Sequence, residues 1–208
     1  RTMQRTLGTL TVLFTIVLVG CSCALMLNQF QDTQAHEKWP FDVAVYREDA
    51  NADFAQEIQI LKDSTDLQKA YVYRIYENGS SRMNRYMRAN VSMAYEEAYF
   101  QYDTYMKLSD YNELREMLGY EPVSLDEQGY LIHTKERLKD TVEPFGELPL
   151  DLGGEKLSCE GIYTEPFEQS GHNGADYMLI VPDRDVQQMK PYYSMLAAKV
   201  QGSVPGDL

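Results

Sequence analysis

Histidines, cysteines and carboxylates are the residues here that could carry acid–base, nucleophilic or metal chemistry. The three histidines, His36, His133 and His172, form no H-x-x-x-H or H-E-x-x-H pattern, so a zinc site would need ligands from distant segments. Cys159 has no histidine nearby and falls in an expected strand, where a buried structural thiol is typical. The sequence has no G-x-S-x-G elbow and no P-loop. We therefore expect no catalytic residue, no metal site, no cofactor and no enzymatic activity.

One expected loop carries a residue pattern that is more informative than its composition. Gly171 and Gly174 bracket His172 and Asn173 just before an apolar stretch. Glycine allows positive φ, so this pattern indicates a tight loop that projects the two polar side chains. The loop could contact a ligand or act as a gate. Equally, it could be a shaped turn between strands in which Asn173 bonds its own backbone.

A second stretch, residues 91–108, is rich in tyrosine with interleaved acids. Tyrosine offers apolar area with a polar tip, and carboxylates attract positive charge, so such a surface suits a cationic amphipathic peptide. Together with the loop above, it supplies the candidate ligand-binding residues Glu96, Glu97, Tyr99, Tyr102, His172 and Asn173.

The elements that would position these residues can be read from hydrophobic periodicity. Alternating residues predict strands, and apolar residues spaced by three and four predict helices. We expect strands over 41–46, 70–76, 98–107, 129–133, 156–164 and 177–181, and helices after 53 and over 109–118. If the first two strands are parallel, they form a crossover unit with the helix between them. The mixture predicts an α+β fold with a mixed sheet and few helices.

Local signals refine these boundaries. Ser109 is a suitable N-cap for the 109–118 helix, and Gly119 is a suitable stop.

Other segments carry weaker or ambiguous signals. Residues 143–154, rich in proline and glycine, predict a loop. Asp183 is expected to cap a last helix, and residues 194–200 fit either a helix or a returning strand. Arg82, Arg85 and Arg88 fit a basic helix face that contacts phosphates or another chain, or a solvated edge.

The charge pattern excludes one class of partner. The chain carries 32 acidic and 19 basic residues, and all the acids but only 17 of the basic residues follow position 28. Nucleic-acid binding needs a basic footprint, so we expect no nucleic-acid partner. The acidic surface either attracts cations and cationic peptides or keeps an exposed domain soluble.

The N-terminal region predicts membrane insertion. No charge occurs between Arg5 and Asp32, and Leu7 to Leu27 is almost continuously apolar. These 21 residues would form a helix of about 31 Å, enough to span a bilayer. Because positive residues tend to stay cytoplasmic, we expect a cytoplasmic stub at 1–6, a transmembrane helix at 7–28 and an extracellular domain at 29–208, in one or two lobes.

The same region has an alternative interpretation. The stretch L-V-G-C-S-C at 18–23 resembles a lipoprotein cleavage site, which would anchor the chain through Cys21. The apolar run, however, continues past the cysteine through Leu27, which favours a span over a short secretory segment. The chain also begins with Arg rather than Met, so we expect an excerpt of a longer protein. An outer domain without a possible internal disulfide fits the cell membrane of a Gram-positive bacterium.

Three segments resemble a known family. S-D-Y-N-E-L-R-E-M-L-G-Y at 109–120, Y-L-I-H-T-K at 130–135 and T-E-P-F-E-Q-S-G-H-N-G-A-D-Y-M-L-I-V-P-D at 164–183 are similar to the large extracellular domain of FtsX-like permeases of ABC transporters from Firmicutes. With the apolar helix included, the resemblance covers most of the chain. It contributes no residue-level ligand site.

The resemblance implies a function and partners. Such permeases work with a separate cytoplasmic ATP-binding subunit, and this chain would pack against further transmembrane helices of the same permease. Relatives export or sense peptide antibiotics or lipid-linked substrates, so a cationic peptide or a sensor kinase is a further expected partner. The alternative is a membrane-anchored lipoprotein or single-pass extracellular binding module.

Overall fold

A computed structural model describes residues 40–78, 82–90, 103–167 and 177–201. These residues all belong to one compact unit that begins at Lys38. The expected transmembrane helix at 7–28 lies outside the described residues. Within them, no helix is both long and apolar enough to cross a membrane.

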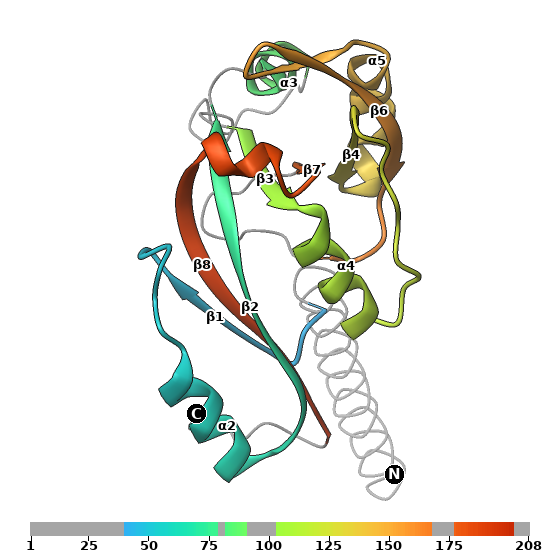
Figure 1. Ribbon diagram of the computed structural model, residues 1–208. Helices are drawn as coiled ribbons and strands as arrows, with labels where there is room; N and C mark the ends of the chain where they lie inside the picture. Colours follow the sequence, from blue (N-terminus) through green and yellow to red (C-terminus); the bar gives the residue numbers. More distant parts are fainter. Residues whose placement is uncertain (1–39, 79–81, 91–102, 168–176, 202–208) are drawn as a thin grey trace, which may run out of the picture. The chain divides into compact units, whose positions relative to one another are not determined.

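The unit is built on a mixed sheet of eight strands, with the order β1-β8-β2-β3-β7-β4-β6-β5. Figure 1 shows how helices lie around it. The expected α+β class with a mixed sheet is confirmed. The described elements are β1 (Val43–Arg47), α2 (Ala55–Ser64), β2 (Asp66–Asn78), α3 (Met83–Asn90), β3 (Asp103–Lys107), α4 (Leu108–Met117), β4 (Gly129–Thr134), η1 (Glu136–Leu138), α5 (Lys139–Gly146), β5 (Leu150–Leu152), β6 (Glu155–Tyr163), β7 (Tyr177–Val181), η2 (Asp185–Gln188) and β8 (Lys190–Gln201).

The last strand lies between the first two. β8 pairs antiparallel with β1 and with β2, so β1 and β2 run parallel to each other but are not neighbours. Residues 194–200, which the sequence left open between helix and strand, therefore belong to a strand. Its alternation places Tyr193, Met195 and Ala197 in one hydrophobic cluster, and Leu196 and Ala198 in another. This is the period of two that a strand buried on both faces requires.

Helices cover the sheet through apolar side chains from both elements. Phe54 and Leu61, at and within α2, pack with Leu196 and Ala198. Tyr111 and Leu114 of α4 pack with Met106, Ile180 and their neighbours. On a third cluster, α3 and α5 contribute Met83, Met87, Val142 and Phe145. Figure 1 shows α3 and α5 near each other, and α4 next to β3.

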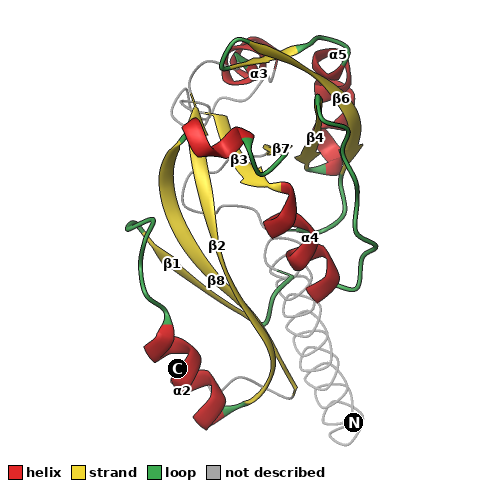
Figure 2. Ribbon diagram, in the orientation of Figure 1, coloured by secondary structure: helices red, strands yellow, loops and turns green. Residues whose placement is uncertain are grey.

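The expected loop over 143–154 is wrong at 143–146 and 150–152, whereas residues 153–154 form a turn. α5, labelled in Figure 2, extends to Gly146 despite Pro144, and β5 occupies Leu150–Leu152. Val142 and Phe145 of α5 are buried. Burial of this apolar face stabilises a short helix that local propensity disfavours, because most helix stability in proteins comes from tertiary packing.

Two capping expectations are also corrected. The N-cap position of α4 is Lys107 rather than Ser109. Asp183, expected to cap a last helix, instead accepts a hydrogen bond from the Ser109 backbone N–H at 3.0 Å. Its carboxylate thus satisfies a free N–H in the first turn of α4, where the helix dipole favours negative charge. Among the described residues, the one helical element after Asp183 is the 3₁₀ turn η2, and the strand β8 follows it.

The other end of α4 terminates as the sequence predicts. Gly119 has φ of +79°, its N–H donates to the Glu116 carbonyl, and the Tyr120 N–H donates to the Arg115 carbonyl at 2.9 Å. This is the paired hydrogen bonding of a Schellman motif, which needs a left-handed residue. The motif turns the chain after α4 so that Tyr120 returns toward Arg115.

The Gly119→Ala variant tests this stop. A Cβ at this position would have no other atom within 4 Å, so the cost is confined to the left-handed backbone. We expect a loss of about 1 kcal/mol in the free energy of unfolding by urea denaturation. Gly119→Asn should lose less, because asparagine tolerates this conformation. Equal losses in the two variants would contradict the backbone explanation.

Candidate functional site

A buried polar network joins the three segments on which the family resemblance depends. His133, the penultimate residue of β4, is 5% exposed. Its Nδ1 lies 2.7 Å from the Tyr111 hydroxyl of α4, and its Nε2 lies 2.9 Å from the Glu165 carbonyl oxygen. A carbonyl only accepts, so Nε2 carries the proton and Nδ1 accepts from Tyr111. The ring is therefore held in one neutral tautomer.

Arg115 extends this network one helical turn along α4. Its guanidinium donates to the Glu121 carbonyl at 2.8 Å and to the Tyr111 hydroxyl at 3.3 Å, and it lies 3.6 Å from Glu165 Oε1. The guanidinium also lies about 5 Å from the ring centroids of three tyrosines, Tyr111, Tyr120 and Tyr163. A guanidinium tolerates burial when its N–H groups are hydrogen-bonded and its charge lies over tyrosine rings. Arg115 thus connects α4 to the chain around Glu121 and Glu165.

The electrostatics of the network oppose acid–base catalysis. Burial, with a smaller contribution from the Arg115 charge, lowers the pKa of His133 to about 4. Burial also raises the pKa of Tyr111 above its usual value. Both ring nitrogens of His133 are engaged, and Phe167 packs on the imidazole with ring centroids 4.7 Å apart. The arrangement holds the chain at 163–167 against β4 and α4; it does not present a reactive group.

A second polar cluster lies at the same ends of the strands, on the opposite face of the sheet. Asp103, fully buried at the start of β3, accepts a hydrogen bond from the Tyr177 hydroxyl at the start of β7. It also accepts from the backbone N–H groups of Met83 and Asn84. Asp103 thereby caps α3 and joins it to two strands. Burial raises the pKa of Asp103 to about 6, against the hydrogen bonds that lower it.

Strand register explains why both clusters lie at the same end of the central strands. β3 and β7 are parallel, with Tyr105 opposite Leu179, so their starts coincide. β4 is antiparallel to β7, with His133 opposite Met178 and Thr134 opposite Tyr177, so its end lies there too. The Asp103–Tyr177 bond and the His133 network therefore occupy the two faces of one strand junction.

This junction adjoins the two stretches that contain the predicted ligand-binding residues. Residues 91–102 immediately precede Asp103, and residues 168–176 lie between Phe167 and Tyr177. The candidates Glu96, Glu97, Tyr99, Tyr102, His172 and Asn173 themselves lie outside the described residues, so their role stays a prediction. The structure places the points where both stretches join the sheet side by side.

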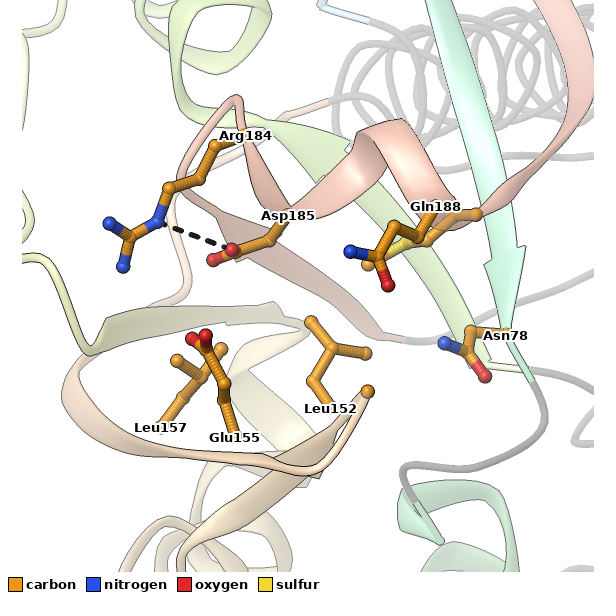
Figure 3. Close-up of a pocket in the computed structure, with 9 residues that line it drawn as sticks. Asn78, Leu152, Glu155, Leu157, Arg184, Asp185 and Gln188 are labelled. Atoms are coloured by element: carbon orange, nitrogen blue, oxygen red, sulfur yellow. Dashed lines mark ion pairs between the residues drawn. The ribbon is translucent and has the colours of Figure 1, made fainter.

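A separate cleft of about 80 Å³ lies between the β5–β6 hairpin and η2. Leu152, Leu157 and Met189 form apolar parts of its lining. Figure 3 shows the carboxyl groups of Asp185 and Glu155 facing each other, with Gln188 and Asn78 at the other end. Arg184 Nε lies 3.4 Å from Asp185 Oδ1, and the guanidinium also donates to the Glu127 carbonyl. Arg184 balances only one of the two carboxylates, so the cleft lining keeps a net negative charge. This charge alone singles out no ligand class.

The described residues contain no cluster of three or more histidine, cysteine or acidic side chains that could bind a metal. Cys159, their one free cysteine, is half-buried, and burial raises the pKa of its thiol, which disfavours the nucleophilic thiolate. Arg82, Arg85 and Arg88 are exposed at and along α3. Sequence reasoning singled out the segments of the polar network, but not the contacts of Arg115 or of the Glu165 carbonyl. The Arg115 contact with Glu121 depends on the turn at Gly119, which no pattern within the helix encodes.

Comparisons with known proteins add a distant likeness in structure. No protein-family model matches the chain, and no curated protein matches it. A crystal structure of a protein described as a putative lipoprotein from Bacillus anthracis is similar, with a TM-score of 0.45 and 10% sequence identity. The match covers 77% of this chain and 83% of that chain.

The His133 network predicts an acid-sensitive stability. A neutral histidine with a folded pKa of about 4, against 6.5 when unfolded, takes up its proton more readily in the unfolded chain. Its stabilising contribution is complete above pH 6.5 and is lost as the pH falls toward 4, by about 3 kcal/mol. We expect urea denaturation of the wild type to show this loss and His133→Gln to show less of it. An unchanged pH dependence in the variant would assign the effect to other groups.

The Asp103 cluster predicts a carboxyl that titrates near pH 6, measurable by ¹³C NMR. The Tyr177 hydrogen bond favours the charged form, so Tyr177→Phe should raise the pKa of Asp103 further. Tyr86→Phe is the matched control, because the Tyr86 hydroxyl donates to the Thr141 carbonyl instead. A pKa that moves equally in both variants would indicate a general loosening of the fold.

Proposed function

We propose that this chain is a membrane-tethered extracytoplasmic binding module without catalytic activity. The observation that carries the proposal is the contrast between its two parts. An uncharged apolar run over 7–27 precedes a strongly acidic region. The described part of that region is an α+β unit in which His133 and Asp103 are buried and engaged in structural hydrogen bonds. Tethering and binding use such a unit; turnover needs reactive groups that can reach a substrate.

A second, more specific candidate is the extracellular domain of an FtsX-like ABC transporter permease. The three segments that resemble this family contact one another through Tyr111, His133 and Glu165. Their shared network supports the idea that they form one structural unit in such domains. On this proposal the apolar run is one permease helix, a separate ATP-binding subunit supplies energy, and the outer domain senses or moves a peptide antibiotic or a lipid-linked substrate.

Mass spectrometry of the protein from native membranes separates the two forms of tethering. A lipoprotein would yield a mature chain that begins at a diacylated Cys21. A permease segment would yield an intact peptide across Gly20–Cys21. The Cys21→Ala variant should abolish processing of a lipoprotein, whereas a membrane-spanning chain should be unaffected. Recovery of the unmodified chain in the soluble fraction would contradict membrane tethering altogether.

The expected cationic peptide partner has its own test. Isothermal titration of the chain in maltoside detergent with a cationic amphipathic peptide should give saturable binding. Replacing Glu96 and Glu97 together by glutamine should weaken it, while Glu143→Gln and Glu147→Gln together remove the same charge at exposed positions of the described surface. Absence of binding, or equal weakening by both double variants, would remove these residues as the peptide site.

A further inference from the structure

A second hollow of the described surface has a consistent chemistry. A groove of about 570 Å³ opens beside β1, the edge strand of the sheet. It is lined by Tyr46 of β1, by residues 48–51 of the loop before α2, and by Lys190, Pro191 and Tyr192 at the start of β8. The groove is therefore formed where the first strand leaves the sheet and the last strand enters it.

Two tyrosine rings are fixed in this groove by a third. Tyr193 is fully buried, and its ring centroid lies 5.1 Å from that of Tyr46 and 5.3 Å from that of Tyr192. Tyr46 and Tyr192 are themselves half-buried and line the groove. Because they pack on an immobile ring, their positions are set before any ligand arrives, which lowers the entropic cost of binding.

Negative charge accompanies the aromatic rings. Glu48 and Asp49 are exposed in the groove lining. The Glu48 carboxylate, like the neighbouring Tyr192, contributes to raising the pKa of Tyr46 above its usual value, after burial as the main cause. The Tyr46 ring and the Glu48 carboxylate thus both belong to the groove lining.

The basic residues nearest the groove are paired with other carboxylates. Lys190 Nζ lies 2.6 Å from Glu77 Oε1, and Arg47 forms an ion pair with Glu57. Lys190 also lines the groove, so the lining carries two carboxylates, Glu48 and Asp49, and one lysine that is paired with Glu77. The net charge of the lining is therefore negative. Aromatic faces beside carboxylates attract cations, because ring quadrupole and carboxylate present negative potential to the same space.

We propose that this groove binds an organic cation of the alkylammonium class, held between Tyr46 and Tyr192 with Glu48 as counter-charge. An ammonium group with methyl or methylene substituents matches both features, since its charge faces the rings and the carboxylate while its carbons cover apolar ring area. The ligand source is either a free small molecule or a lysine side chain on a peptide. The site is independent of how the chain is tethered to a membrane.

The test uses the whole chain in maltoside detergent, followed by NMR titration. Choline probes the free-ligand source, N-acetyl-lysine amide probes the peptide source, and 3,3-dimethylbutanol has the shape of choline without its charge. We expect saturable shifts with choline or the lysine derivative, and none with the alcohol. The cation that binds more tightly identifies the source.

Variants locate the site. Tyr192→Leu should weaken binding by about 2- to 30-fold, the range of a single cation–π contact, whereas Tyr192→Phe keeps the ring and should bind nearly as well. Glu48→Gln should weaken binding more than Glu147→Gln, which removes an equal charge elsewhere on the surface. Thermal unfolding confirms that each variant is folded.

Three results would overturn the proposal. The first is equal binding of choline and the neutral alcohol, which would make the groove merely apolar. The second is unchanged affinity in folded Tyr192→Leu and Glu48→Gln, which would place the cation elsewhere. The third is the absence of saturable binding by either cation to the folded wild type.

Discussion

The pairing of β8 with both β2 and β1 is the constraint on which the described unit depends. β8 runs antiparallel to β2 from Lys190 to Gln201 and to β1 from Ser194 to Ala198. Among the described strands, β1 therefore pairs only with β8, whose residues lie about 150 positions later in the chain. Such pairing requires closure of a long loop, which is entropically unfavourable until the intervening elements fold. The first strand, the α2 face and the groove beside Tyr46 all depend on this late strand.

Polar interactions stabilise the other half of the sheet. β3 and β7 start where β4 ends, so these strand ends lie side by side. The Asp103–Tyr177 bond lies on one face of the sheet there, and the Tyr111–His133 bond lies on the other. Asp103, Tyr177, Tyr111 and His133 each bond a partner from a different element, so these bonds specify register as well as stability. His133 and Asp103 respond oppositely to pH, because burial opposes the charged form in each, cationic for the histidine and anionic for the aspartate.

Charge and aromatic residues connect the fold to the proposed binding role. Ordering a tyrosine side chain near the surface costs conformational entropy, and packing of its ring offsets this cost. Around Arg115, three tyrosine rings surround a cation of the chain itself. Beside β1, Tyr46 and Tyr192 line an open groove with Glu48. In the first arrangement the cation belongs to the chain itself, whereas the second is the groove for which we propose an external cation.

The sequence by itself determined the α+β class, the apolar run, the bounds of β7 and the stop at Gly119. These follow from periodicity, charge and the backbone freedom of glycine, which are local properties. Tertiary structure alone decided that β8 inserts between β1 and β2, that Asp183 caps α4 and that α5 forms around Pro144. It likewise decided that Tyr111, His133 and Glu165 meet, although they are up to 54 residues apart in the chain. Which distant strand pairs with which is chosen by burial of both faces together, and one segment's pattern cannot encode that choice.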